Sequence, residues 1–244
     1  MTMNSSLTTV GILGYGEIGR ALDAIYIEEG FVPLVRDLDR NDELGGVNVL
    51  NICIPWDDNF ISATQEYLKE INPGLAIIHS TVPPGTTREL SKTFSNIVHS
   101  PVRGVHPHLA QGIRTFVKAI GGQGWEDAKE HLEGLGIEVK VYESSITTEM
   151  AKLLDTSYYG VCIAWHDYAK KLCDVWDVNF DEAQTHYNST YNEGYEDLGK
   201  DNVIRPTLVP PTNSTIGGHC VVPNAEILRT VLDSKLLEAI TDLK

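Results

Sequence analysis

One glycine loop constrains the fold of this chain more than any other feature of its sequence. The loop GYGEIG occupies residues 14–19, at the end of the apolar run 8–14 and at the start of a segment with helical spacing, 17–29. At this spacing the first glycine allows a tight turn, the second lets a phosphate approach the backbone, and the third lets the helix pack close to the strand. The N–H groups at the start of the helix then face the phosphate. The loop therefore predicts a dinucleotide site.

Strand and helix patterns alternate along the first half of the chain. Near-continuous apolar runs at 47–55 and 75–82 are typical of strands buried on both faces, and helical spacing appears at 58–70 and 125–136. Alternation of this kind indicates a parallel sheet with helices on its faces. We therefore expect the glycine loop to belong to a Rossmann-like fold.

The pattern changes near residue 145. From 147 to 176 the sequence has helical character with no proline and one glycine, and a final helix is expected from about Asn224 to the end. The predicted fold class is α/β, in two domains: an NAD-binding Rossmann-like parallel sheet at 1–145 and an all-helical domain with a long central helix at 146–244.

Charge and composition disfavour several classes of partner. The chain carries 34 acidic and 19 basic residues, a net charge of −15, and such a field repels nucleic-acid phosphates and anionic lipids. No apolar run is long enough to span a membrane, and the first residues lack the pattern of a secretory signal. The four cysteines form no CxxC pair, as in reduced intracellular proteins. We expect a cytoplasmic protein with a small-molecule substrate.

An acidic residue indicates which dinucleotide is bound. Asp37 follows the predicted strand 31–36 and lies 18 residues after Gly19. A carboxylate at this position accepts hydrogen bonds from the adenosine ribose hydroxyls and repels a 2′-phosphate. The predicted cofactor is therefore NAD, although the neighbouring Arg36 leaves NADP open.

A second glycine motif carries a cysteine. Residues 217–220 read GGHC, and two glycines let the backbone bend sharply and present the thiol of Cys220 in a cleft. A thiolate there would attack an aldehyde carbon and form a thiohemiacetal, which a second hydride transfer converts to a thioester. From spacing alone, a buried structural cysteine explains the motif equally well.

Taken together, four segments resemble a known enzyme family. GGHC followed by Val-Val-Pro resembles the active-site loop of the UDP-glucose/GDP-mannose/UDP-N-acetylmannosamine dehydrogenases. STVPPGTT at 80–87, EMAK at 149–152 and the glycine loop are similar to further segments of that family, in the same order. The resemblance covers nearly the whole chain.

The resemblance implies a reaction and a set of site residues. Family members oxidise a primary alcohol of a sugar to a carboxylate and use two NAD per turnover. It implies that Cys220 is the nucleophile of the second oxidation, that Lys152 lies near the reacting carbon, and that Thr81 lies beside the nicotinamide. The expected site residues are: catalytic Thr81, Lys152, Thr156 and Cys220; cofactor-binding Gly14, Gly16, Glu17, Ile18, Gly19, Asp37, Pro55 and Thr81; substrate-binding Arg103, Gly217, His219 and Asn224.

The sequence departs from the family at three of its active-site positions. Thr156 stands where the family has asparagine, Asn224 where it has aspartate, and Val102 where it has glutamate. We expect these changes to impair hydrolysis or formation of the thioester. The segment after Asp37 is also shorter than in the family. The chain ends soon after the cysteine loop, so we expect a smaller substrate or a partner that completes the site.

Two further groups of residues permit more than one interpretation. His99 precedes the segment SPVRGVHPH at 100–108, which contains His106 and His108. These histidines form a metal site, or a loop that contacts an anionic substrate together with Arg103, or a plain loop; we expect no metal. A polar aromatic stripe at 187–195 packs near the cleft or contacts substrate, and Arg205 meets a phosphate or carboxylate or is solvated.

Two other functions remain as alternatives. A single-step enzyme resembling β-hydroxyacid dehydrogenases also has a lysine on the first helix after the Rossmann domain. A non-catalytic NAD-binding protein would retain the fold without turnover. The resemblance further implies a homodimer formed through the helix at 147–176, whereas burial of that helix within one chain is the alternative.

Overall fold

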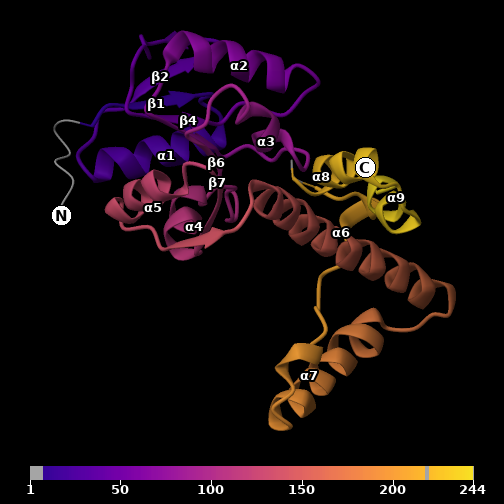
Figure 1. Ribbon diagram of the computed structural model, residues 1–244. Coiled ribbons are helices and arrows are strands. Elements are labelled where there is room, and N and C mark those ends of the chain that lie inside the picture. Colours follow the sequence, from indigo (N-terminus) through magenta and orange to yellow (C-terminus); the bar gives the residue numbers. More distant parts are fainter. Residues whose placement is uncertain (1–7, 218–219, 244) are drawn as a thin grey trace. The chain divides into compact units, whose positions relative to one another are not determined.

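The computed structural model describes residues 8–217 and 220–243 (Figure 1). The chain divides between Lys152 and Leu153 into two compact units, and each unit has a hydrophobic core of its own. The division into an NAD-binding domain at 1–145 and a helical domain at 146–244 stays a prediction.

A sheet forms the centre of the first unit. In the described residues its strands are β1 Val10–Leu13, β2 Leu34–Asp37, β3 Arg40–Asn41, β4 Val49–Ile52, β5 Leu75–Ile78, β6 Ile97–His99, β7 Lys118–Gly122 and β8 Val139–Tyr142. They lie in the order β3-β2-β1-β4-β5-β6-β7-β8. Strands β2, β1, β4, β5 and β6 run parallel, as predicted for a Rossmann-like fold. The predicted α/β fold class is thus confirmed.

The prediction of a parallel sheet fails at two strand pairs. β3 pairs antiparallel with β2 because only residues 38–39 separate them, and so short a turn joins antiparallel strands only. β7 pairs antiparallel with β6 after a helix, Leu109–Thr115 (α4), that the sequence pattern did not predict. With seven residues, α4 is too short to show a clear helical period.

Helices cover both faces of the sheet (Figure 1). Helices α1 (Glu17–Glu28), α4 and α5 (Trp125–Gly134) contribute to one core, and α2 (Phe60–Ile71) and α3 (Thr86–Leu90) to the other. On the first face Leu22 and Ile25 of α1 are fully buried, and on the second Phe60 and Leu68 of α2 are almost so. Each such side chain stabilises the fold by about 1.5–3 kcal/mol.

The long central helix is confirmed and runs from Ser145 to Val175 (α6), so the division of the chain falls within it. Its single glycine has a packing reason. A Cβ on Gly160 would lie 2.7 Å from Val221 and 3.0 Å from Ile240, so α6 passes close to two later helices. These are α8 (Val221–Val231) and α9 (Lys235–Thr241).

The end of the chain differs from the single helix expected from Asn224. The first helix starts at Val221, and α9 begins separately after Ser234, whose hydroxyl accepts a hydrogen bond from the Leu236 N–H at 3.2 Å. A serine with this contact is a helix N-cap and marks a new helix.

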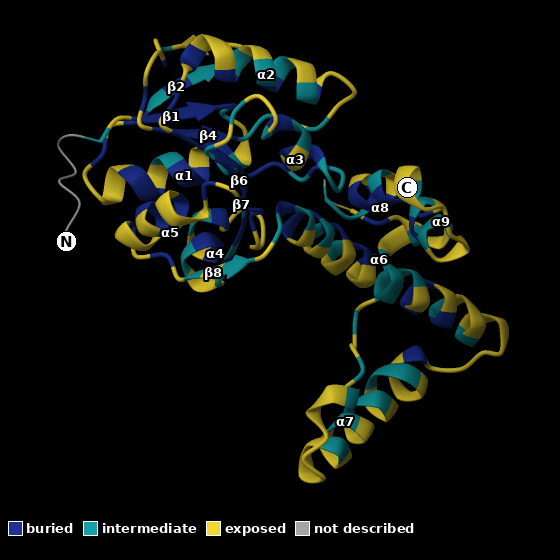
Figure 2. Cartoon of the chain, in the orientation of Figure 1, coloured by how far each residue is buried: buried dark blue, intermediate teal, exposed yellow. Residues whose placement is uncertain are grey.

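Within α7 (Tyr187–Asp197) no residue is buried (Figure 2). No helix in the described part of the chain is long and apolar enough to cross a membrane.

Candidate cofactor and active site

The three glycines of the loop occupy different environments. Gly14 has a φ of +93°, in the left-handed region, and a Cβ there would lie 2.8 Å from the carbonyl carbon of Cys53. A Cβ on Gly19 would lie 2.1 Å from the Gly14 carbonyl oxygen, so α1 packs directly on the loop. At Gly16, in contrast, a Cβ would meet no atom within 4 Å. The loop is therefore open at Gly16, which fits close approach of a dinucleotide phosphate.

Helix α1 begins directly after this open position. Gly16 is the N-cap and has no side chain to accept from the first N–H groups. The first intrahelical bond runs from the Arg20 N–H to the Gly16 carbonyl at 3.0 Å. The N–H groups of residues 17–19 precede that bond, and groups of this kind bind phosphate at helix N-termini. This geometry fits the role predicted for Glu17 and Ile18.

The carboxylate of Asp37 is fixed beside the loop. One oxygen accepts a hydrogen bond from the Tyr15 N–H, and the other accepts from the Leu38 N–H at 2.6 Å. These two bonds lower the pKa of Asp37. A carboxylate has about four acceptor positions, so it keeps capacity for ribose hydroxyls. Arg36, which left NADP open, forms an ion pair with Glu70 at 2.8 Å.

An aromatic residue in the same loop was missed by the sequence analysis. Two guanidinium groups lie near the Tyr15 ring, with Arg20 5.6 Å and Arg40 5.7 Å from its centre. The Tyr15 hydroxyl donates to Asp23 at 2.5 Å. Arg40 also pairs with Asp42 at 2.9 Å. Positive charge is thus present near Asp37, although the sequence offers no spacing signal for it.

Pro55 and Thr81 follow β4 and β5. Because these strands run parallel to β1, both residues lie at the sheet edge that carries the glycine loop. The Ser80 hydroxyl donates to the Ile54 carbonyl at 2.6 Å and joins the two segments. Pro55 is exposed and Thr81 is half-buried. The structure therefore places both predicted cofactor residues at the edge where a dinucleotide binds in this fold class.

The three histidines do not form a cluster. His99 ends β6 and is fully buried, and burial lowers its pKa to about 3. His106 instead approaches the glycine loop, with its Nδ1 2.8 Å from a carboxylate oxygen of Glu17. His108 is exposed and precedes α4. His99 therefore lies in the core and not in a loop beside Arg103, because β6 carries it there. No group of three metal-ligating side chains occurs among the described residues.

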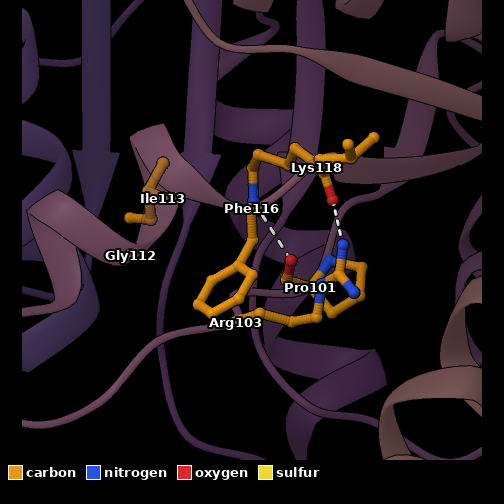
Figure 3. Close-up of a pocket in the computed structure, with 7 residues that line it drawn as sticks. Pro101, Arg103, Gly112, Ile113, Phe116 and Lys118 are labelled. Atoms are coloured by element: carbon orange, nitrogen blue, oxygen red, sulfur yellow. Dashed lines mark hydrogen bonds between the residues drawn. The ribbon is translucent and has the colours of Figure 1, made fainter. Parts of the chain in front are cut away.

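A buried lysine, Lys118, was also missed. It is 4% exposed, lines a small pocket with Pro101, Arg103 and Phe116 (Figure 3), and its pKa falls to about 7 because of burial. Its Nζ donates to the carbonyls of Ser100 at 2.9 Å and Pro101 at 3.2 Å. Its only sequence signal is a lysine at the start of the apolar strand KAIGG.

The predicted substrate residue Arg103 lies in the same pocket. Its guanidinium donates to the carbonyl of Val117 and lies 5.6 Å from the centre of the Phe116 ring. Arg103 remains partly available, since its side chain is exposed. A role for it in substrate binding stays a prediction.

The second unit brings two of the predicted residues together. The Asn224 side-chain amide donates to the Thr156 hydroxyl at 2.9 Å. Both residues depart from the family pattern, and here they contact each other. Cys220 is half-buried and immediately precedes α8, while Gly217 is exposed. His219 lies outside the described residues.

The aromatic stripe binds another segment of the same unit. The ring centre of Tyr191 lies 6.3 Å from that of Tyr187 and 5.2 Å from that of Tyr195. The Arg205 guanidinium lies 4.3 Å from the centre of the Tyr191 ring, and the Asn192 side chain pairs with the backbone of Arg205. The stripe therefore packs against residue 205, and Arg205 is half-buried and not simply solvated. A contact of Arg205 with a phosphate or carboxylate stays a prediction.

The sheet, the open glycine loop and the fixed acid define a Rossmann-type unit for a nicotinamide dinucleotide. In sequence, the chain is similar to curated UDP-N-acetyl-D-mannosamine dehydrogenases. Identity to the Methanococcus maripaludis protein is 28% over 168 residues, which is 66% of this chain and 35% of that protein. Identity to the Pyrococcus horikoshii protein is 24% over 213 residues, 78% of this chain and 48% of that protein. The family resemblance is confirmed, and the chain spans less than half the length of these relatives.

Solved structures show the same fold. A UDP-D-ManNAc dehydrogenase from Pyrococcus horikoshii matches 97% of this chain and 68% of its own, with a TM-score of 0.79 and 19% identity. A 3-hydroxyisobutyrate dehydrogenase from Mycobacterium tuberculosis matches 96% of this chain and 91% of its own, with a TM-score of 0.71 and 17% identity. Another neighbour, with a TM-score of 0.63 and 14% identity, is in complex with NADP+. No protein-family model matches the sequence.

Proposed function

We propose that this chain is an NAD-dependent dehydrogenase that oxidises an alcohol group of a nucleotide-sugar or of a smaller sugar or hydroxy acid. The observation that supports it best is the glycine loop, open at Gly16 and joined to the Asp37 carboxylate. When bound, the nicotinamide supplies the acceptor for a hydride. The proposed cofactor-binding residues are Gly14, Gly16, Glu17, Ile18, Gly19, Asp37, Pro55 and Thr81.

NAD is preferred to NADP in this proposal. The Asp37 carboxylate is ionised at neutral pH, and two backbone N–H groups lower its pKa further. A 2′-phosphate would meet this charge, whereas ribose hydroxyls would donate to it. Arg36 contributes little to binding a phosphate, since Glu70 neutralises it. Arg40 is likewise paired, with Asp42, so Arg20 beside the Tyr15 ring is the cation that opposes the preference.

The catalytic roles rest on the sequence resemblance. We assign Lys152 to hold the substrate oxygen and receive its proton, with Arg103 as a contact for an anionic substrate. Cys220 would bond to the carbon of an aldehyde product, and Thr156 and Asn224 would support that step. Cys220 precedes α8, whose N-terminal dipole favours negative charge beside it. Gly217 and His219 would belong to the same substrate loop.

A single-step dehydrogenase of the β-hydroxyacid type is the second candidate. It is favoured by the match to 91% of the 3-hydroxyisobutyrate dehydrogenase chain. It is also favoured by Thr156 and Asn224, because neither residue is ionisable and so neither balances the charge of Lys152. In this candidate Cys220 has no chemical role.

One experiment separates these functions. The purified protein is incubated with NAD and a panel of UDP- and GDP-sugars and small hydroxy acids, and NADH absorbance is followed for wild type and Cys220→Ala. Two NADH per sugar, reduced to one or fewer in Cys220→Ala, support the four-electron enzyme. One NADH per substrate in both proteins supports the single-step enzyme. NADH binding without turnover would contradict both and support a non-catalytic binder.

We also propose a homodimer formed through α6. Large apolar side chains on one face of this helix are exposed: Leu154, Tyr158, Trp165, Tyr168 and Leu172 are 53, 63, 54, 56 and 46% exposed. Their spacing of 4, 7, 3 and 4 residues keeps them on one stripe. An apolar stripe of this length marks an interaction surface. Light scattering should give a dimer mass for wild type and a monomer for Trp165→Lys with Tyr168→Lys; a monomeric wild type would contradict the proposal.

A further inference from the structure

The segment STVPPGTT, residues 80–87, is held at both ends by the first unit. At its start, the Ser80 carbonyl oxygen lies 3.1 Å from Nε2 of His99. At its end, the N–H groups of Gly85 and Thr87 donate to the two carboxylate oxygens of Glu149 at 2.6 and 2.8 Å. Thr81, which the proposed function places beside the nicotinamide, lies between these anchors.

The hydrogen positions at His99 follow from its partners. A carbonyl oxygen only accepts, so the His99 Nε2 must carry a hydrogen to bond Ser80. Burial keeps the ring neutral, so its Nδ1 then has a free lone pair. The Thr148 hydroxyl lies 2.9 Å from Nδ1 and 2.9 Å from the Ser145 carbonyl oxygen, so these two acceptors share its one hydrogen. The start of the segment is thereby connected through His99 to α6.

The end of the segment is capped from a distant part of the chain. Helix α3 begins after Gly85, which has a φ of +98° and no side chain to cap the helix. Glu149, 64 residues later, supplies the carboxylate that a capping residue would normally provide. Its side chain is fully buried, and burial raises its pKa while its hydrogen bonds to Thr87 and Gly85 oppose that shift. Replacing this carboxylate would leave at least one N–H without an acceptor.

Both anchors come from one turn of α6. Thr148 and Glu149 precede Lys152 by four and three residues, so they lie one helical turn before it and on the same side of the helix. The groups that hold the segment of Thr81 are therefore rigidly connected to the backbone that carries Lys152.

We propose that Glu149, together with the His99–Thr148 pair, is a positioning residue that fixes Thr81 relative to Lys152. This inference rests on the proposed function, in which Thr81 lies beside the nicotinamide and Lys152 beside the substrate oxygen. A misplacement of about 1 Å between reacting groups lowers the rate on the order of 100-fold. Cofactor affinity should change little, because the glycine loop and Asp37 lie on other strands.

The test compares Glu149→Gln, Glu149→Asp and Tyr26→Phe. Gln keeps the shape of Glu149 but offers one acceptor oxygen to two N–H donors. Asp keeps both acceptors on a shorter side chain, so it should restore part of the function. Tyr26→Phe is the control for stability: its hydroxyl is buried against Asn51 and His131 on the other face of the sheet. Kinetics, melting temperature and NADH fluorescence are measured for each protein.

We expect Glu149→Gln to lower kcat about 10- to 100-fold with an NADH Kd within about 3-fold of wild type. The kcat of Glu149→Asp should fall between those of wild type and Glu149→Gln. Tyr26→Phe should have a lower melting temperature than wild type but the same kcat. Wild-type kcat in Glu149→Gln, or an equal loss in Tyr26→Phe, would overturn the proposal. If wild type binds NADH without turnover, the proposed function fails. The nicotinamide emission then tests the anchor: an altered emission in Glu149→Gln at unchanged Kd supports it, and an unaltered emission overturns it.

Discussion

A carboxylate oxygen of Asp37 accepts a hydrogen bond from the backbone N–H of Tyr15, which joins the end of β2 to the glycine loop of β1. The two parts of the chain predicted to bind the ribose and the phosphates of a dinucleotide are therefore fixed to each other. Arg36, the neighbour of Asp37, is engaged with Glu70 on α2. We therefore expect the choice between NAD and NADP to depend on Asp37 and on Arg20 beside Tyr15.

Removal of the Asp37 carboxylate should shift cofactor preference. In Asp37→Ala, NADH loses charge-assisted hydrogen bonds worth about 1.5–3 kcal/mol, or roughly tenfold or more in Kd. The affinity for NADPH should fall less, because the repulsion between its 2′-phosphate and the Asp37 carboxylate also disappears. Asp39→Ala, an exposed acid in the same turn, is the matched control. Fluorescence titration with both cofactors checks the expectation, and an unchanged ratio of the two Kd values would contradict it.

Lys118 should make stability rise with pH. Burial lowers its pKa to about 7, whereas a lysine in the unfolded chain titrates near ~10.4. The unfolded state therefore binds the proton more tightly, and the stability present above the unfolded pKa is lost progressively as the pH falls from ~10.4 to about 7. The free energy of unfolding should increase between pH 7 and 9 by at most ~1.4 kcal/mol per pH unit. Urea unfolding of wild type and Lys118→Met checks this, since the methionine variant should lack this slope.

The contact between Thr156 and Asn224 should be visible in a double-mutant cycle. Asn224 is 4% exposed and donates to the Thr156 hydroxyl at 2.9 Å. A hydrogen bond of this kind contributes about 0.5–1.5 kcal/mol. Thr156→Ala, Asn224→Ala and the double variant should therefore show a coupling of that size in denaturant unfolding. Strictly additive losses would mean that the two side chains do not depend on each other.

Local patterns in the sequence predict much of this fold. The glycine loop specifies β1 and α1, because Gly14 and Gly19 each answer a separate steric demand, and the uninterrupted periodicity from 147 to 176 specifies α6. Helix α4 and the reversed β7 were missed because a seven-residue helix gives almost no period. The break before α9 was missed although Ser234 is an N-cap signal.

The contacts of individual side chains were much harder to predict. His99 follows two apolar residues and precedes a proline-rich loop, so its sequence fits strand and loop equally, and only the pairing of β6 decides its burial. Lys118 is buried because β7 reverses beside β6, where carbonyls of Ser100 and Pro101 receive its amine. Glu149 reaches a turn 64 residues earlier, and no local pattern indicates such a contact.

The most direct test of the account is a titration of NADH into wild type and Gly16→Val. A Cβ at Gly16 would meet no atom within 4 Å, so we expect the variant to keep the wild-type melting temperature. It should lose NADH affinity tenfold or more, since the side chain occupies the space expected for the phosphates. Gly19→Ala is the contrasting control and should destabilise the fold, because its Cβ would lie 2.1 Å from the Gly14 carbonyl oxygen. Equal NADH affinity in wild type and Gly16→Val, or no binding by wild type, would contradict the account.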